Sequence, residues 1–505
     1  MTVEREDGTP PLLRVRVAPG PRTLVGNLDL RLNGPLQAAL DAGDARALAV
    51  RRTLVAQWPL RTGQPWRQPA WSAAKVEAVA RLRAEGYAAA ALAESRAQID
   101  AASQRAALEV AIDSGPLFRL GEVRIEGLSR YGEAAVRNVA AFGPGEPYSE
   151  QKLQEFQDRL GRVGLFDSVS VELDADPSHA DAAVVRVRVR ELQAQQATAG
   201  VGYSANTGQR FTLEHIHRRV FGRPWRARSK FELGRDLQSA ETELTSHPLA
   251  DNWRNLVGGG VERLTTTSEV RKSVRLRVGR ARETLAIDRL YYLELTRANL
   301  FAEASGVTTT ATALSANYPW VFRYVDNILL PTRGFTTSAQ AGGGYSLASD
   351  APNGPFGRAT ARLTFYRPFG DWLTQTRIEA GQVVANSGVG IPDPLLFRAG
   401  GDDSVRGYAF RSLGPVKNGA VASGRVLLTA SAEAAHPISP RYPAFLWALF
   451  VDAGNAADSW RGLRPAFGYG AGLRWRSPVG PLRVDLAYGQ DVHRLRLHLS
   501  VGVAF

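Results

Sequence analysis

The C-terminal sequence Arg494-Leu-Arg-Leu-His-Leu-Ser-Val-Gly-Val-Ala-Phe505 is the most informative stretch of this chain. Leucine, valine and phenylalanine occupy its odd-numbered positions, and arginine, histidine and small residues occupy the even-numbered ones. Side chains of a strand alternate between two faces, so one face here is wholly apolar. A tilted strand that crosses a bilayer needs about 9–11 residues of this kind. The stretch therefore predicts the closing strand of a transmembrane β-barrel.

The same alternation recurs from residue 195 to residue 505, in segments separated by Gly, Asn, Asp and Pro; residues 274–278, 469–476 and 482–488 are clear examples. About sixteen such segments fit in this length, and bacterial barrels have an even number of strands. We therefore predict an antiparallel 16-stranded transmembrane β-barrel over residues 195–505. Aromatic residues near the segment ends are expected at the lipid–water interfaces; they are Tyr318, Trp320, Trp447, Trp475 and Tyr488.

The net charge is +13, from 62 Lys+Arg and 49 Asp+Glu, with arginine far in excess of lysine. A basic balance is often typical of nucleic-acid binding. Here arginines recur at alternate strand positions, for example 275/277 and 474/476, which favours a polar barrel lumen. A genome rich in arginine codons would also account for much of the excess. The chain has no cysteine, so disulfides and thiolate metal sites are excluded. Neither a nucleic-acid partner nor a cofactor is expected.

Residues 20–191 contain the same unit twice. Each copy begins with Gly-Pro, continues through a Gly-x-Pro-aromatic segment into a helical stretch closed by glycine, and ends in alternating strands. This order predicts two small α+β modules, at residues 20–114 and 115–192. Exposed strand edges in such modules would accept a client strand by β-augmentation. The alternative is that the modules are inert spacers.

Residues 12–17 have the pattern of the strand that closes each module. Residues 1–19 are therefore predicted to be the remnant of a truncated first module. Residues 1–8 contain no basic segment followed by an apolar run, so no signal peptide is present in the given chain. Because an outer-membrane protein requires one, we expect the true start to lie upstream.

Four motifs follow one another along the predicted barrel: Pro331-Thr-Arg-Gly334, Val405-Arg-Gly-Tyr408, Phe450-Val-Asp-Ala-Gly454 and the hairpin 470–485. In this order they resemble the POTRA–barrel superfamily of outer-membrane assembly and secretion proteins. Within this superfamily, residues 200–210 most resemble the TamA-like family. This resemblance covers nearly the whole chain from about residue 12. It implies tandem POTRA modules in the periplasm and a barrel in the bacterial outer membrane. TamA-like proteins carry three POTRA modules, whereas only two are complete here.

The resemblance also implies that a long loop, at about residues 387–423, folds into the barrel. Its Arg406 is expected to pair with Asp452 and Glu433 on the inner wall, because a buried guanidinium pairs strongly with carboxylates. We predict that this cluster locks the loop in place and has no chemistry of its own. The predicted loop-lock residues are Arg406, Gly407, Tyr408, Glu433, Asp452 and Gly454.

The first barrel segment, residues 197–204, is rich in glycine, which weakens a strand. The seam between the first and last strands is therefore predicted to be the weakest part of the wall. Unpaired backbone groups cannot remain in lipid, so an opened seam would template a client strand. The predicted seam residues are Gly200, Gly202, Tyr203, Leu497, Leu499 and Phe505.

The chain has no Gly-x-Ser-x-Gly, His-Glu-x-x-His or P-loop motif, so an enzyme is not predicted. His215 and His217 share one strand face, and we interpret them as lumen-lining residues rather than metal ligands. Asp402 and Asp403 are adjacent, so their side chains diverge and do not form a catalytic pair.

The leading hypothesis is an outer-membrane protein assembly factor that passes β-barrel and autotransporter-type clients through the seam without a nucleotide. The alternative is a two-partner-secretion-type transporter that exports a soluble client through the lumen. The expected partners are the outer-membrane lipid bilayer, unfolded outer-membrane protein clients and, by resemblance, a TamB-like inner-membrane-anchored protein.

Overall fold

The computed structural model describes residues 21–504 apart from 267–268, 285, 304–305, 329, 418 and 478–479. The predicted remnant, 1–19, and Phe505 lie outside the described residues. The chain divides into two compact units: one holds most of the two modules, and the other holds residues 191–505 together with 129–139 and 162–165. None of the described helices is both long and apolar enough to span a bilayer.

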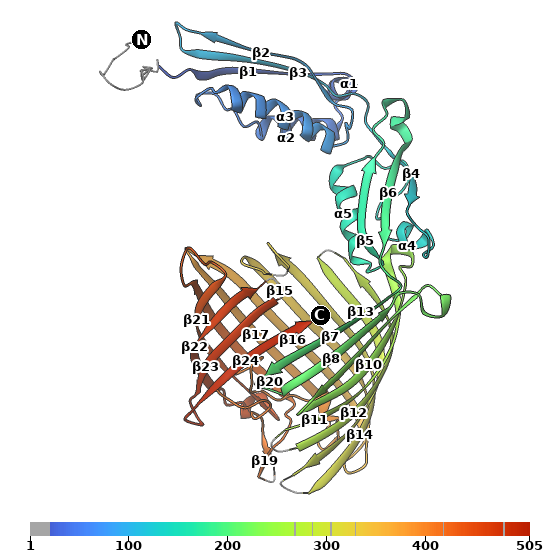
Figure 1. Cartoon of the computed structure of the whole chain (residues 1–505), viewed down its shortest axis with the longest axis vertical. Coiled ribbons are helices and arrows are strands. Elements are labelled where there is room, and N and C mark those ends of the chain that lie inside the picture. Colours follow the sequence, from blue (N-terminus) through green and yellow to red (C-terminus); the bar gives the residue numbers. More distant parts are fainter. Residues whose placement is uncertain are drawn as a thin grey trace, which may run out of the picture. The chain divides into compact units, whose positions relative to one another are not determined.

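The first module packs three helices on a three-stranded sheet (Figure 1). Its central strand β3 buries Ala106, Leu108, Val110 and Ile112 at alternate positions. Helix α3 has a proline in its first turn and buries Trp71, Ala74, Ala78 and Leu82 at helical spacing. The elements are β1 (Leu24–Asn33), α1 (Pro35–Asp41), α2 (Ala45–Ala56), α3 (Gln68–Ala84), β2 (Ala91–Asp100) and β3 (Arg105–Asp113).

The second module repeats this plan with two helices, one of them a single turn. Its sheet order is β4-β6-β5, with β6 parallel to β4. Helix α5 buries Leu153, Phe156 and Leu160. The elements are β4 (Leu120–Glu126), α4 (Ala134–Arg137), α5 (Glu150–Arg162), β5 (Phe166–Leu173) and β6 (Ala183–Glu191). In the described part of each module, the two outer strands of the sheet have one unpaired edge.

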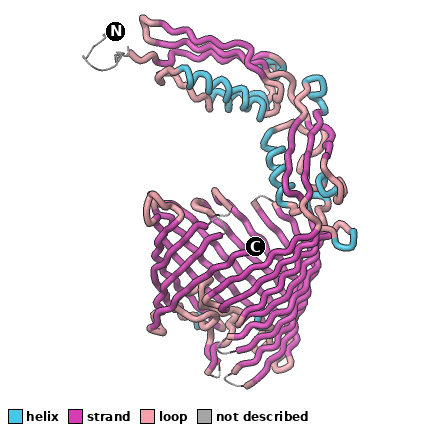
Figure 2. The backbone as a smooth tube through the Cα atoms, in the orientation of Figure 1, coloured by secondary structure: helices cyan, strands magenta, loops and turns pink. Residues whose placement is uncertain are grey.

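Sixteen of the described strands close into an antiparallel barrel, which confirms the predicted fold class (Figure 2). They are β7 (Gln195–Ser204), β8 (Gly208–His217), β9 (Trp225–Gly234), β10 (Leu237–Ser246), β11 (Trp253–Thr265), β12 (Glu269–Glu283), β13 (Ile287–Ala302), β14 (Val307–Val325), β15 (Gly334–Ala348), β16 (Gly354–Phe369), β17 (Trp372–Ala385), β20 (Val426–Pro437), β21 (Phe445–Ala457), β22 (Ala466–Ser477), β23 (Gly480–Gly489) and β24 (Arg494–Ala504). A hairpin of two short strands, β18 (Val416–Lys417) and β19 (Ala420–Val421), lies in the loop between β17 and β20.

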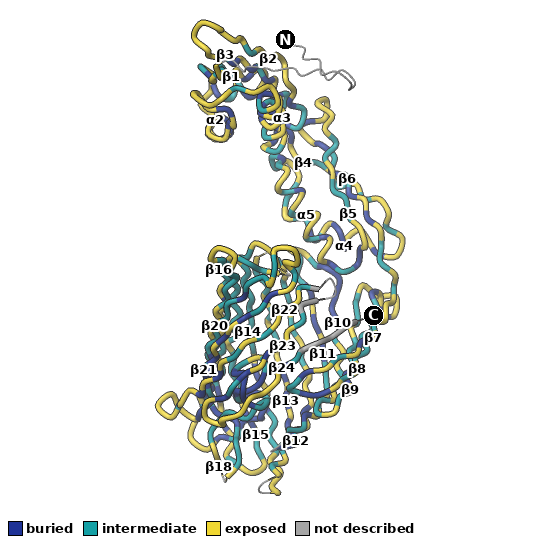
Figure 3. The backbone as a smooth tube through the Cα atoms, turned by 60° about the vertical axis from the view of Figure 1, so that its left-hand side comes forward, coloured by how far each residue is buried: buried dark blue, intermediate teal, exposed yellow. Residues whose placement is uncertain are grey.

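The barrel wall is apolar outside and polar inside, and burial alternates along its strands (Figure 3). On β12, Val274 and Leu276 are exposed on the outer face, whereas Arg271 and Ser273 are buried toward the lumen. The same alternation fixes the face of each aromatic side chain. Several aromatics pack in pairs near strand ends: Tyr291 with Tyr318, Trp372 with Trp447, Phe445 with Trp475 and Tyr469 with Tyr488.

The interpretation of His215 and His217 as lumen-lining residues is wrong. They lie on the same face of β8 as Phe211, which is exposed on the outer surface. β8 pairs with β9 without a register shift, so every second residue of β8 lies on the same face. His215 and His217 therefore lie on the outer face with Phe211. His215 shares a hydrogen bond of 3.2 Å with Gln195 of the neighbouring strand.

Candidate functional site: the lumen loop and the barrel seam

Residues 386–425, between β17 and β20, form a long loop whose apolar side chains pack against the barrel's inner wall. Ile391, Leu395 and Phe397 are buried in this cluster. Gly381 on β17 makes room for the aromatic ring, since a Cβ there would lie 2.6 Å from the Phe397 Cζ. The loop therefore has an apolar core of its own in addition to its polar anchors.

The first polar anchor centres on Arg406, which is 6% exposed. Its guanidinium donates to both carboxylate oxygens of Asp452, from Nε at 2.7 Å and from Nη2 at 2.9 Å. Its backbone N–H donates to Asp452 Oδ2 at 3.0 Å. The Asp452 side chain is fully buried, and Arg406 also lies 3.4 Å from the centroid of the Phe450 ring. A bidentate pair with a cation–π contact fixes the loop's position and direction.

Two further carboxylates and a second arginine complete this anchor. Arg406 Nη1 donates to Glu433 at 2.9 Å and to Asp485 at 3.1 Å. Arg474 on β22 donates to Glu433 from both Nε and Nη2, and to Asp485 Oδ1 at 2.5 Å. Each buried charge in the anchor therefore has an opposite charge beside it, as burial requires.

Glycines at this anchor allow backbones to approach closely. Gly407 has φ +93°, and a Cβ there would lie 2.6 Å from the Gly489 backbone N. Gly468 on β22 faces the loop, and its Cβ would lie 1.9 Å from the Arg406 carbonyl oxygen. Gly454 is similarly tight against β20, with a Cβ position 2.5 Å from the Leu428 oxygen. Tyr408 is 2% exposed and donates its hydroxyl to Asp491 at 3.0 Å.

A second polar anchor holds the other part of the loop to β11 and β12. Asp393 accepts from Arg271 Nη1 at 2.9 Å and from the loop's own Arg411 at 2.8 Å. Arg271 also donates to Glu262 at 2.6 Å. Arg398 of the loop pairs with Glu269, and both side chains are nearly fully buried. This anchor was not predicted from the sequence.

The two anchors lie on opposite walls. Around the closed barrel, β12 and β22 are eight strand steps apart in either direction. The loop therefore crosses the lumen and is held to both walls by buried ion pairs.

The seam between β24 and β7 is short. Among the described residues, five pairs are in register, from Ser500 with Ser204 to Ala504 with Gly200, whereas β12 and β13 share fifteen. Gly202 lies opposite Gly502, so this part of the seam has no cross-strand side-chain packing. Residues 195–199 of β7 extend past Ala504 and have no β24 partner among the described residues.

The loop tip bridges the seam. The backbone N–H of Asp402 donates to Asn206 Oδ1 at 3.1 Å, just after β7. The Asp402 carboxylate meets Nδ1 of His498 on β24, and His498 Nε2 accepts from the Gly407 N–H at 2.9 Å. With Nε2 accepting, the imidazole proton lies on Nδ1. One loop segment thus holds both strands that flank the seam.

The structure brings the predicted loop-lock residues together, with Arg406, Glu433 and Asp452 in direct contact. Among the predicted seam residues, Gly200, Gly202 and Tyr203 pair with β24. Leu497 instead pairs with Leu486 of β23. The carbonyl of Leu499 accepts a hydrogen bond from the N–H of Ala205, directly after β7.

Sequence reasoning missed several residues of the site, namely Ser431, Arg474, Asp485, Asp393, Asn206 and His498. The alternation marks Arg474, Asp485 and His498 as lumen-facing. No pattern along the chain pairs them with the loop.

Sixteen antiparallel strands with an apolar outside and an ion-paired loop in the lumen, preceded by small α+β modules, define an outer-membrane barrel protein with periplasmic modules. Residues 193–505 match the Omp85 superfamily domain, and residues 118–191 match the POTRA surface antigen variable number repeat. The chain belongs to the Omp85 superfamily. It is an outer-membrane β-barrel protein of that superfamily, and its POTRA region lies in the periplasm.

Among curated proteins, the chain is 24% identical over 445 residues to the outer membrane protein assembly factor BamA of Neisseria meningitidis serogroup B, covering 75% of this chain and 55% of that protein. Chloroplastic outer envelope protein 80 of Arabidopsis thaliana is 34% identical over 115 residues, 21% of this chain and 14% of that protein. The chain thus spans about half the length of the first relative and less of the second.

Two solved structures have a similar fold. BamA from Haemophilus ducreyi lacking POTRA domains 1–3 superposes with a TM-score of 0.69 at 17% identity, covering 96% of this chain and 100% of that one. CdiB from Acinetobacter baumannii superposes with a TM-score of 0.55 at 15% identity, covering 99% and 94%.

Proposed function

We propose that this protein assembles other outer-membrane proteins by accepting their strands at the seam between β7 and β24. The observation that carries the proposal is that residues 195–199 of β7 have no β24 partner among the described residues, next to a described seam of five residue pairs. A free strand edge pairs readily with an incoming strand, and the bilayer strongly favours such pairing. The energy comes from the client's own hydrogen bonds and apolar burial, without a nucleotide.

The loop tip supports a gated seam. Asp402, Gly407 and their partners Asn206 and His498 tie the two flanking strands together. Release of a few hydrogen bonds at the tip would leave the seam held by the short ladder between β24 and β7. The ion pairs of Arg406 and Asp393 would meanwhile keep the rest of the loop in the barrel.

Secretion of a soluble client through the lumen is the alternative. It would require the loop to leave the lumen, which breaks two buried ion-pair clusters on opposite walls. Removing one partner of a buried pair typically costs about 3–5 kcal/mol. Lateral opening leaves both clusters intact, which favours assembly over secretion.

We further propose that the protein is TamA-like and works with a TamB-like inner-membrane-anchored partner. The support is the local sequence at residues 200–210 and the order of the barrel motifs. The outer edge of β2 pairs with no strand among the described residues, and its residues are nearly all exposed, so it offers a site for β-augmentation by such a partner or by a client.

The test uses the absence of native cysteine. Single cysteines are placed at residues 195–203 in full-length protein in cells, and a nascent outer-membrane protein carries a cysteine in its last strand. Adducts that follow a period of two along β7 are expected. Cysteines at matched positions of β15, on the barrel wall away from the seam, serve as controls. Further single cysteines are placed at lumen-facing positions such as 275 on β12, and adducts confined to these positions would instead establish secretion and refute lateral assembly.

A further inference from the structure

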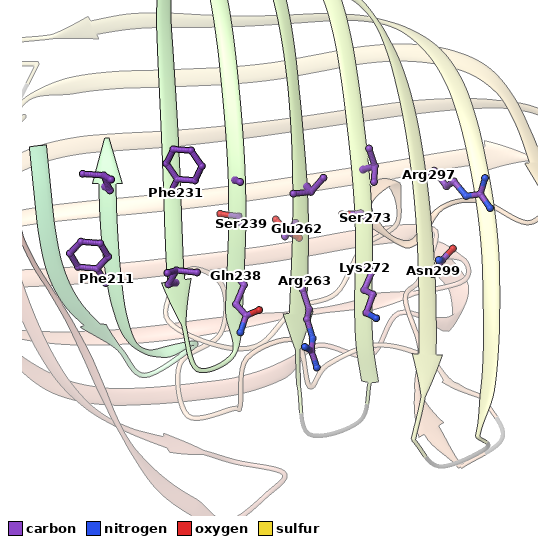
Figure 4. A pocket seen from close by; sticks show the side chains of 15 residues that line it. Phe211, Phe231, Gln238, Ser239, Glu262, Arg263, Lys272, Ser273, Arg297 and Asn299 are labelled. Atoms are coloured by element: carbon purple, nitrogen blue, oxygen red, sulfur yellow. The ribbon is translucent and has the colours of Figure 1, made fainter. Parts of the chain in front are cut away.

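The outer face of the barrel carries an open groove of about 780 Å³ across β8–β13 (Figure 4). Its apolar floor is formed by Phe211, Phe231, Leu233, Val261 and Val274, all between 44% and 63% exposed. Because this face of the wall contacts lipid, the groove is available to acyl chains rather than to water.

Two cations, Arg263 and Lys272, lie at one end of the groove, and a third, Arg297, lies beside its apolar floor. Arg263 and Lys272 are direct Cα partners across β11 and β12, and Arg297 lies one row further along on β13. Figure 4 shows Arg263 and Lys272 pointing toward the loop ends of their strands. Within the described residues, none of the three side chains forms a hydrogen bond or ion pair with another residue.

Their orientation follows from their neighbours. Glu262 and Arg271, which flank Arg263 and Lys272 in sequence, bond to each other on the lumen side. Alternation therefore places Arg263 and Lys272 outside, and both are exposed. Like charges directly opposite each other destabilise a strand pair, and an anion bound between Arg263 and Lys272 would relieve this repulsion.

The cations lie at the extracellular end of the wall. β7 begins at residue 195 on the periplasmic side, so the turns after β7, β9 and β11 are extracellular. Arg263 lies two residues before the end of β11, and Lys272 lies three residues after the start of β12. Positions this close to the extracellular strand ends are where we expect the headgroups of the outer leaflet.

We propose that the groove binds a phosphorylated glycolipid of the extracellular leaflet, with its phosphates at Arg263, Lys272 and Arg297 and its acyl chains over the apolar floor. The cations span three neighbouring strands, about 10 Å at about 4.8 Å per strand, which is wider than one phosphate group. Gln238 and Asn299 continue the row on either side and are suited to sugar hydroxyls. The cations lie on β11, β12 and β13, away from the seam strands, and the proposal does not depend on the proposed function.

The same barrel offers a matched control. Arg280, Arg282 and Arg289 are also on the outer face of β12 and β13, with Arg282 opposite Arg289, but at the periplasmic end. Two of them stack on Trp253, at 5.0 and 5.8 Å from its ring centroid.

The experiment is native mass spectrometry of the full chain in detergent with three added lipids: a bisphosphorylated glycolipid, its dephosphorylated form and phosphatidylglycerol. The unaltered chain is expected to retain the bisphosphorylated glycolipid in preference to the other two. The triple variant R263Q/K272Q/R297Q should bind it about 100-fold more weakly, from about fivefold per cation. The control variant R280Q/R282Q/R289Q should bind it as the unaltered chain does.

The charge-preserving variant R263K/R297K should retain binding. The heat-dependent gel shift of the folded barrel shows whether each variant is folded. Equal binding by the triple variant and the unaltered chain would overturn the proposal. Equal retention of phosphatidylglycerol, or an equal loss in the control variant, would overturn it as well.

Discussion

Substitution of Arg406 by methionine should free one end of the loop while the other end stays attached. The change removes the guanidinium that contacts Asp452, Glu433 and Asp485, and leaves the fully buried Asp452 without its bidentate partner. Breaking a buried ion pair on one side costs about 3–5 kcal/mol, or roughly 10²- to 4 × 10³-fold in the local opening constant. Ser431, which donates to Asp452 at 2.6 Å, offsets part of this cost.

Hydrogen–deuterium exchange measures the effect by segment. Amides of residues 401–408 should lose protection by that factor, whereas residues 391–399 should stay protected by the Arg271–Asp393 and Arg398–Glu269 pairs. Arg275→Met is the control, since this exposed lumen-side arginine has no ion pair among the described residues. Unchanged exchange at residues 401–408 would refute the role of Arg406 as an anchor. Equal release of residues 391–399 would refute two independent anchors.

Three further predictions concern the loop, a module and the seam. Gly468→Ala should displace the loop, because the new Cβ would lie 1.9 Å from the Arg406 carbonyl oxygen, and proteolysis of the loop should therefore be faster. Gly357→Ala is the control: its Cβ would have its nearest contact at 4.0 Å, so the rate of loop proteolysis should not change. Burial opposes ionisation of Glu191, but the N–H groups of Ser129, Arg130 and Tyr131 outweigh it and lower its pKa. The Glu191 carboxylate should therefore stabilise residues 129–131 fully above pH about 4.3, and this stabilisation should be lost as the pH falls through the lowered pKa. Hydrogen–deuterium exchange of residues 129–131, corrected for intrinsic rates, measures the loss. Glu191→Gln should abolish this pH dependence. A disulfide between Y203C and V501C should block client assembly until it is reduced, whereas one between L486C and L497C, joining β23 to β24, should not; full assembly with the seam locked would exclude lateral opening.

The pairing of Arg406 with Asp452 and Glu433 could be proposed before the fold was known, because it rests on short motifs and a resemblance. The remaining anchor residues could not. Arg406 and Asp485 are 79 positions apart, and Arg271 and Asp393 are 122 apart. Alternation identifies which of these side chains face the lumen, but not which carboxylate each arginine meets. Strand register and the path of the loop decide that.

The sequence by itself determined the class of this protein. Alternation with a period of two, repeated in segments of bilayer length, leaves no stable solution except a closed barrel, and the duplicated units before it specify two modules. Only the tertiary structure decided where the loop is anchored, which strand edge is left free and which cations share a groove. Those properties depend on barrel closure, which brings β24 beside β7 and places β12 opposite β22. Contacts of that kind are set by the geometry of the closed sheet and are not encoded in any single segment.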